Sequence, residues 1–375
     1  HCMPCWICEP IPAGRPSIES YAAPHEDGYL KAEAVSSYAL GGAAFCYWLW
    51  RQQRAGSEQP HGSVLSAWGE PDVGYANVLE VERARKEVEP VMLSTVPVQA
   101  EAAVVYSDRA KAFLKTEPHR GLNYRSLITG FYERFVSLGI HRDVIFEGSA
   151  LDGYKLLFTP FLHYMPQELI EKASAFAENG GIWVAGPLTG GRTKHHTIHT
   201  DCGLGPLETC AGVKTLYTFP MDERRAAGSA FGVKAPLSLW SAVFEARPSE
   251  ALGIIEQGPA SGKAFITEHK QGKGKIVMLG SMPAGEAGDV MLKRLISHYA
   301  EEAGITMKTD VTPGTIVAPR TGPDGIVWVM INMDGKGGEV TLHKDAVDLI
   351  ANKREAAGRL TIGPYQYRII LFPDM

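Results

Sequence analysis

Two carboxylates and a histidine stand where side chains could hold a sugar. Glu9 follows the apolar run Cys5-Trp6-Ile7-Cys8, and Glu58 and His61 follow a second apolar run that ends at Trp50. Carboxylates grip hydroxyls in bidentate fashion, and aromatic rings stack on the apolar side of a pyranose. These residue types therefore suit a carbohydrate ligand. Charged side chains on an ordinary surface loop would explain the same spacing, and the residues alone leave both readings open.

The two runs need a parallel sheet to bring their carboxylates together. Residues 1–93 follow the order strand, loop, helix, strand, loop, helix, with a helix expected over 28–40 and a strand buried on both faces over 43–50. Such alternation is typical of a parallel sheet or barrel, in which chemistry is placed at the carboxyl ends of the strands. We expect Glu9 and Glu58 to open onto the same end of one sheet. Two such units cannot close a barrel.

The rest of the chain predicts two further domains. Residues 94–303 alternate strands and helices, which favours an open, mostly parallel sheet with helices on its faces. The expected strands cover 102–106, 144–147, 155–161 and 181–185, and the expected helices cover 124–138, 167–179 and 289–303. From residue 304 onward, short apolar runs alternate with turn signals such as Asp334-Gly335 and Gly337-Gly338, which predicts a small antiparallel β domain.

Composition excludes several classes of function. The 375 residues carry a net charge of −5 and no Lys/Arg block, so we expect neither a nucleic-acid partner nor a membrane partner. The longest apolar run, 38–50, is too short to span a bilayer. The six cysteines fit free thiols in a reducing compartment, which predicts a cytoplasmic protein.

Two segments resemble metal sites. Cys2, Cys5 and Cys8 lie beside His1, but residues three apart on a strand point to opposite faces, so these thiols cannot converge there. The segment 194–203 gathers several possible zinc ligands, for which a solvated or interface loop is the commoner explanation: His195, His196, His199, Asp201 and Cys202. The expected site contains no metal and no cofactor.

An extended motif resembles the end of the catalytic barrel of glycoside hydrolase family 42, the β-galactosidases. The motif consists of "WICEPIP" followed by "GYLKAEAVSSYALGGAAFCYWLWRQQRAGSEQPHG". The positions that match the family's pattern are Tyr47, Trp50, Arg51, Gln52, Arg54, Gly56, Glu58, His61 and Gly62. The resemblance continues through an α/β domain and a short β domain that ends in "IGPYQYRIILF".

This resemblance implies a retaining β-galactosidase that acts on terminal β-galactosides. Glu9 would be the nucleophile that forms a galactosyl-enzyme, and the substrate would be bound by Glu58, His61, Trp50 and Arg51. Residues 1–93 would be the end of a (β/α)8 barrel, 94–303 an amidotransferase-like α/β domain that assembles a homotrimer, and 304–375 a small β-sandwich-like domain. The chain departs from the family at Ser17, where a Trp is usual, and at Leu49, where a polar residue is common.

A retaining glycosidase also needs an acid/base carboxyl group about 5–5.5 Å from its nucleophile. The family carries that group in an Asn-Glu pair on the fourth barrel strand, and these 375 residues contain no such pair. We therefore expect the chain to begin at the seventh barrel strand of a larger enzyme and to be inactive alone.

Two other functions remain open from the residues. The first is a non-catalytic module for oligomerisation or sugar binding. The second is a separate amidotransferase-like enzyme, for which Cys202 and Cys210 are the available thiols. They lack the sharp strand-to-helix turn that a nucleophile needs, and Gly186-Pro187 stands at the position after the strand.

Overall fold

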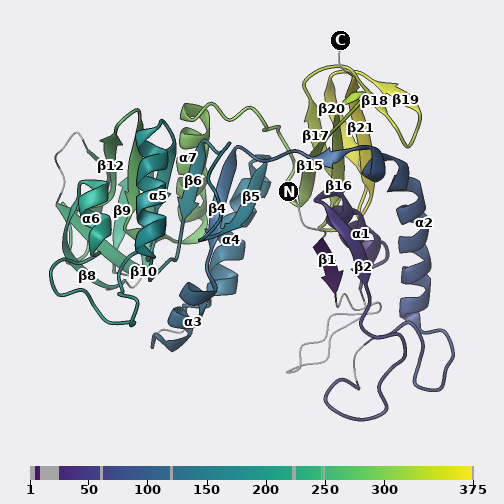
Figure 1. The fold of residues 1–375 in the computed structure, drawn as a ribbon, viewed down its shortest axis with the longest axis horizontal. Helices are drawn as coiled ribbons and strands as arrows, with labels where there is room; N and C mark the ends of the chain where they lie inside the picture. Colours follow the sequence, from purple (N-terminus) through teal and green to yellow (C-terminus); the bar gives the residue numbers. More distant parts are fainter. Residues whose placement is uncertain are drawn as a thin grey trace. The chain divides into compact units, whose positions relative to one another are not determined.

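The computed structural model describes residues 5–8, 25–59, 62–118, 121–221, 225–245, 247 and 250–373. The chain divides into two units, one formed by residues 1–98 with 309–375 and the other by residues 99–308. The second unit is thus inserted into the first in sequence. Each unit is described by itself (Figure 1).

The first unit begins with the expected alternation of strand and helix. Strand β1 (Cys5–Cys8) pairs in parallel with β2 (Gly42–Cys46), with Cys8 opposite Cys46. Helix α1 (Tyr29–Ala39) precedes β2, and the 22-residue helix α2 (Val73–Ser94) follows a long loop. The parallel pairing places the carboxyl ends of β1 and β2 at one edge. The expectation that the second strand is buried on both faces is wrong, because among the described residues β2 pairs with β1 alone and stays partly exposed.

The carboxyl-terminal part of this unit is the predicted small β domain. Its six-stranded sheet has the order β19-β18-β21-β16-β15-β3, and the pair β17-β20 covers one face. The strands are β3 (Val96–Pro97), β15 (Thr315–Gly322), β16 (Gly325–Asn332), β17 (Gly338–Leu342), β18 (Ala346–Asp348), β19 (Lys353–Glu355), β20 (Gly358–Ile362) and β21 (Tyr367–Pro373). Strand β3 comes from the segment just after α2, so this sheet joins distant parts of the sequence.

Helices α1 and α2 pack on this sheet and share its core. Ala32 and Val35 of α1 and Val88 of α2 are buried in one cluster with Val329 and Ile369 of the sheet. Burial of each of the larger side chains in this cluster contributes roughly 1.5–3 kcal/mol to the stability of the fold. The barrel end and the small β domain therefore share a hydrophobic core.

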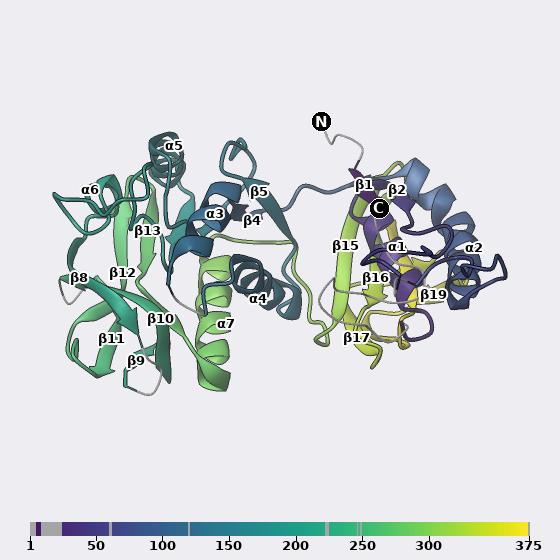
Figure 2. The ribbon, with the colours of Figure 1, turned by 90° about the horizontal axis from the view of Figure 1, so that it is seen from below.

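The second unit is an α/β domain whose described strands form an eleven-stranded sheet. Ten of them follow the order β14-β10-β9-β11-β12-β13-β7-β6-β4-β5, and β8 pairs with β10. The strands are β4 (Ala102–Tyr106), β5 (Arg142–Phe146), β6 (Leu156–Thr159), β7 (Ile182–Ala185), β8 (Lys214–Met221), β9 (Ala227–Ala230), β10 (Val233–Glu245), β11 (Ala251–Gln257), β12 (Ala264–Gln271), β13 (Gly274–Leu279) and β14 (Ser281–Pro283). Figure 2 shows α5 (Gln167–Glu178) and α6 (Pro206–Ala211) on one face, and α4 (Tyr124–Ser137) and α7 (Gly285–Glu302) on the other.

The sheet is mixed, so the expectation of a mostly parallel sheet is wrong. Strands β5, β4, β6, β7 and β13 are parallel to their neighbours along that run, as expected. The strands between β8 and β12 pair in antiparallel fashion. Short connections at glycines in the left-handed region allow this arrangement, for example Gly232 at φ 70° between β9 and β10.

Side-chain caps fix the starts of several helices. Ser107 accepts a hydrogen bond from the backbone N–H of Ala110 at the start of α3 (Asp108–Thr116), and Asn123 accepts one from Ser126 at the start of α4. Among the described residues, no helix is long and apolar enough to cross a membrane.

Candidate functional site

The side chain of Glu58 is held in place by two neighbours from its own loop. The indole Nε1 of Trp48 donates a hydrogen bond to Glu58 Oε2 at 3.3 Å, and Gln53 Nε2 donates to the same oxygen at 2.8 Å. Both donors are neutral, and no residue that the structure describes makes a hydrogen bond to Oε1 of the carboxylate. The carboxylate is thereby oriented while it retains acceptor capacity, which suits a group that binds hydroxyls.

The loop that carries Glu58 is itself braced by a neighbouring segment. Backbone bonds run from Leu65 N to Trp50 O at 2.9 Å and from Gln52 N to Leu65 O at 2.9 Å. The side chain of Gln52 adds a bond to the carbonyl of Gln59 at 3.0 Å. These bonds fix the segment after β2 as a short ladder, so Glu58 is presented from an ordered framework.

Trp50 and Arg51 occupy different kinds of position. The Trp50 side chain is 67% exposed, so its ring is available for stacking. The guanidinium of Arg51 donates to the carbonyl oxygen of Ala67 through Nε at 3.1 Å and Nη2 at 2.7 Å. In this structure Arg51 therefore anchors the turn 66–69, in which Trp68 is 76% exposed.

Three positions of the expected site lie outside the described residues: Glu9, His61 and Ser17. The parallel pairing of β1 with β2 directs the residues after both strands to one edge, and the shared placement of Glu9 with Glu58 stays a prediction. Sequence reasoning did not identify Gln53 as a partner of Glu58. Its spacing of five residues within a polar loop is the only signal that could have found it.

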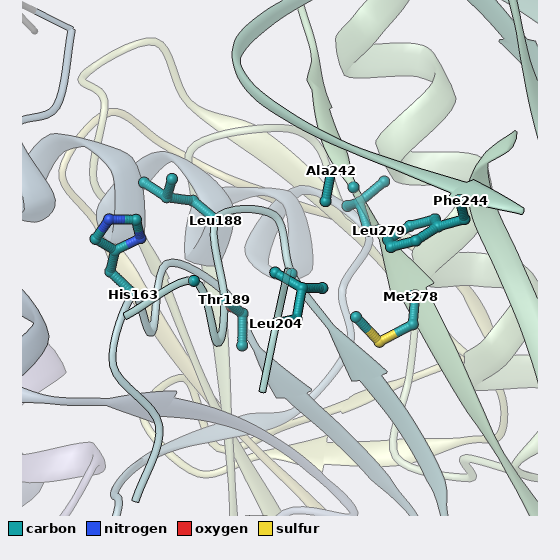
Figure 3. A pocket seen from close by; sticks show the side chains of 11 residues that line it. His163, Leu188, Thr189, Leu204, Ala242, Phe244, Met278 and Leu279 are labelled. Carbon is teal, nitrogen blue, oxygen red and sulfur yellow. The ribbon is translucent and has the colours of Figure 1, made fainter. Parts of the chain in front are cut away.

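The α/β domain provides poor conditions for a thiol nucleophile. Burial raises the pKa of the Cys210 thiol, and burial together with the carboxylates of Glu208 and Asp201 raises that of Cys202. Both changes favour the protonated thiol over the nucleophilic thiolate. Beside Gly186, at the carboxyl end of β7, lies a small cavity of about 10 Å³ between side chains such as His163, Leu188 and Leu204 (Figure 3). That volume has room for about one water molecule and for no substrate.

The His/Cys loop does not converge as a set. Among the described residues, the groups that bring three potential metal ligands together include His196 of this loop but not His195, His199, Asp201 or Cys202. His196 meets Glu117 and His163, which come from two other segments.

A parallel strand pair that ends in a braced, aromatic-rich loop, followed by an inserted α/β domain and a β domain, defines the carboxyl-terminal architecture of a barrel glycoside hydrolase. Three family models match successive parts of the chain: β-galactosidase over residues 2–88, the β-galactosidase trimerisation domain over 100–306 and the β-galactosidase C-terminal domain over 314–372. The chain belongs to the glycoside hydrolase family 42 β-galactosidases.

Relatives and solved structures agree with this assignment. The chain is 76% identical to β-galactosidase YesZ of Bacillus licheniformis and 66% identical to that of Bacillus subtilis, in each case over 99% of this chain and 56% of the relative. Its fold matches the β-galactosidase of Bacillus circulans sp. alkalophilus with a TM-score of 0.85 at 19% identity, over 96% of this chain and 54% of that one. The family 42 β-galactosidase Gan42B gives 0.84 at 20% identity, over 98% and 53%. The chain thus spans little more than half the length of these proteins.

Proposed function

We propose that the full-length protein hydrolyses terminal β-galactosides with retention of configuration, and that Glu9 is the nucleophile. The observation that carries this proposal is the oriented carboxylate of Glu58 in the loop after β2, which also carries the exposed ring of Trp50. Family membership supplies the reaction class, and the position of Glu9 directly after β1 supplies the candidate nucleophile.

The roles within the site follow from what each group can do. Glu58 accepts hydrogen bonds from galactose hydroxyls together with His61, and Trp50 offers an apolar face to the ring. Arg51 contributes to substrate binding indirectly, by anchoring the turn 66–69 through the carbonyl of Ala67. Glu9 attacks the anomeric carbon, the bond to the departing oxygen breaks, and a second carboxyl group donates the proton to that oxygen. We place this acid/base group in the part of the relatives that the 375 residues do not span.

The proposal extends to assembly and location. Residues 1–93 form the barrel end, 94–303 the domain that assembles a homotrimer, and 304–375 the small β domain. The match to a trimerisation domain over 100–306 supports the assembly. Three cysteines that form no disulfide, Cys46, Cys202 and Cys210, support a cytoplasmic location.

The test of the nucleophile uses the full-length protein with a nitrophenyl galactoside. Glu9→Ala abolishes turnover, because loss of the attacking carboxylate removes the covalent step. Added azide restores turnover and gives the inverted galactosyl azide, since the small anion fills the cavity left by the carboxylate. Azide rescue distinguishes a nucleophile from a residue that only binds the substrate.

The matched control is Glu70→Gln, which changes an exposed carboxylate further along the same chain segment. Glu70 bonds to Ser66 through its backbone N–H and carbonyl, and the substitution leaves both groups in place. This variant keeps wild-type turnover. Full activity of Glu9→Ala, or loss of activity without azide rescue, would contradict the assigned role. A full-length protein that binds galactose without turnover would instead support a non-catalytic sugar-binding module.

A further inference from the structure

Three segments of the α/β domain bring two imidazoles and a carboxylate together. Glu117 directly follows α3, His163 lies between β6 and α5, and His196 lies in the loop between β7 and α6. Glu117 Oε1 is 2.9 Å from His163 Nε2 and 3.1 Å from His196 Nε2, and all three atoms lie within 4.8 Å of one another. The His163 and Glu117 side chains are 1% and 12% exposed, and that of His196 is 26% exposed.

The hydrogen bonds of Thr116 determine which nitrogen of His196 carries a proton. The hydroxyl of Thr116 donates its single hydrogen to the carbonyl of Phe113 at 2.8 Å. Its oxygen also lies 3.3 Å from His196 Nδ1, so it accepts there and Nδ1 bears the hydrogen. In the neutral imidazole, Nε2 then presents a lone pair to the Glu117 carboxylate at 3.1 Å. Two lone pairs at that distance repel each other, and either a metal cation or a second proton on His196 removes the repulsion.

The other two groups are of types that bind metal ions. The carboxylate of Glu117 is paired with Arg192 Nη2 at 3.0 Å, and the His163 side chain, 1% exposed, directs Nε2 at Glu117 Oε1 at 2.9 Å. Zinc binds such groups as neutral imidazole and as carboxylate, so zinc binding displaces any proton held on the two Nε2 atoms.

The ligand spacing is close to that of a zinc site. Bonds of about 2.0–2.1 Å in tetrahedral geometry put neighbouring ligand atoms about 3.3 Å apart. The two measured distances of 2.9 and 3.1 Å are slightly shorter, so an ion enters after small outward shifts. Two contacts orient the imidazole of His196 as outer partners of zinc ligands do. They are a tilted ring contact with Phe113, with centroids 4.4 Å apart and planes at 30°, and the bond from Nδ1–H to Thr116.

Access and charge are compatible with an ion. Glu117 also lines an open groove of about 470 Å³ between α3 and the start of α4, and the His196 side chain is 26% exposed. Arg192 Nη2 pairs with Glu117 Oε1 at 3.0 Å, the oxygen that also faces the two histidines, so the ion shares this atom with Arg192. A second group, Glu268 with His298 and Glu302, differs because Lys275 Nζ bridges two carboxylates, at 2.8 and 2.5 Å, and so already neutralises both.

We propose that Glu117, His163 and His196 bind one zinc ion, which fastens the end of α3 to the segments that follow β6 and β7. Water takes the fourth ligand position, as in other sites with three protein ligands. The role of the ion is structural, and the proposal does not depend on the hydrolase reaction. It differs from the sequence-based expectation, in which a solvated or interface loop was the commoner explanation for the segment that holds His195, His196 and His199.

The test compares zinc content and zinc affinity of the full-length protein with those of three variants. His196→Ala and Glu117→Gln each lose one equivalent of zinc per chain relative to the parent, and zinc no longer raises the melting temperature of the inserted domain. His195→Ala changes an exposed histidine of the same loop and retains the full zinc content. Because only the difference between variants is used, zinc bound elsewhere in the protein does not affect the result.

A second measurement separates a metal ion from a proton. In zinc-saturated protein, nitrogen NMR of His196 shows a metal-bound Nε2 and a protonated Nδ1, and anomalous diffraction at the zinc edge places one peak between the three ligand atoms. Equal zinc content in the parent and His196→Ala would overturn the proposal. A His196 ring protonated on both nitrogens in the presence of saturating zinc would also overturn it, since the proton would then occupy the place of the ion.

Discussion

Arg320 joins the barrel end to the small β domain through an unusual set of partners. The residue lies on β15, is 3% exposed, and directs its guanidinium at the ends of α1 and α2. Its N–H groups donate to one hydroxyl, Thr95 Oγ1 at 2.8 Å, and to four backbone carbonyls, those of Tyr38, Ala39, Met92 and Thr95, at 3.2, 2.7, 3.1 and 2.7 Å. The last carbonyls of a helix lack partners within the helix and carry the negative end of its dipole. One side chain thus caps two helices.

We predict that Arg320→Met destabilises the first unit by about 3–5 kcal/mol. The substitution leaves several buried carbonyls without donors, each costing roughly 1–3 kcal/mol, while the unfavourable burial of the guanidinium is relieved. That burial lowers the pKa of Arg320, because removing the charge from water is unfavourable. Arg320→Lys retains a cation but offers three donors in place of five and cannot span both helices. It should lie between the parent and Arg320→Met.

Hydrogen exchange measured by mass spectrometry tests this reasoning region by region. If the free energy of opening falls by 3–5 kcal/mol, hydrogen exchange in α1 and α2 becomes roughly 150- to 4,000-fold faster. Peptides of α5 in the other unit stay unchanged. Arg359→Ala is the control, because this exposed arginine makes a single surface ion pair with Glu339 at 3.4 Å. Unchanged exchange in α1 and α2 of Arg320→Met would refute the capping role.

Three further predictions concern acid stability, assembly and the loop 47–72, called the sugar loop because it carries Glu58. Burial opposes ionisation of Glu101, but bonds from Lys155 and from two backbone N–H groups outweigh it and lower its pKa to about 2. The ionised Glu101 carboxylate therefore contributes fully to folding stability above its ordinary pKa near 4.5, and this contribution disappears as the pH falls toward 2. In acid unfolding curves, Glu101→Gln should lose less stability over that pH range than the parent. Gln53→Ala removes one hydrogen-bond donor to Glu58 and should raise KM about 5-fold in the full-length protein, with a smaller change in kcat. The control Arg54→Ala, at an exposed neighbouring position, should leave KM and kcat unchanged. Light scattering of the full-length protein at micromolar concentration should give three times the chain mass, and a monomer would contradict the assembly proposed for the α/β domain.

Local sequence signals predicted the parallel half of the α/β domain well. The strand expected over 102–106 is β4 with the same bounds, and the helix expected over 124–138 is α4. These elements combine clear apolar periodicity with a nearby cap such as Asn123, and both signals are short in sequence. The match of the family pattern to the three parts of the chain is confirmed in the same way, because each motif is continuous along the sequence.

The antiparallel half was not predicted, for a reason visible in its longest strand. Strand β10 runs for 13 residues from Val233 to Glu245, contains Pro236, and has irregular register between Ser238 and Ser241. A proline and a bulge interrupt the alternation of apolar and polar residues that identifies a strand. The pairing partners then decide the structure, and they lie far away in sequence.

The proposed sugar site and the proposed zinc site differ in the same way, because the partners of one are near in sequence and those of the other are distant. Glu58 meets donors five and ten residues away, so a motif that covers one loop predicts its environment. Glu117 meets His163 and His196, which lie 46 and 79 residues further along the chain, and no spacing rule connects them. Sequence inspection therefore found a histidine-rich loop but could not select the one histidine that the fold brings to a carboxylate.

The capping by Arg320 also bears on how the sugar loop is positioned. The loop 47–72 begins at the end of β2 and ends at α2, and β2 itself starts three residues after α1 ends at Ala39. Arg320 binds the carbonyl of Ala39 at one side and that of Thr95, just beyond α2, at the other. Both supports of the loop are thus held from a strand of the small β domain, more than 200 residues away in sequence. A displacement of either helix would shift the braced segment that presents Glu58, and a shift of about 1 Å in such groups is costly for a positioned substrate. We infer that the small β domain supports the proposed sugar site by fixing the helices that frame the loop, although none of the domain's described residues belongs to the loop itself.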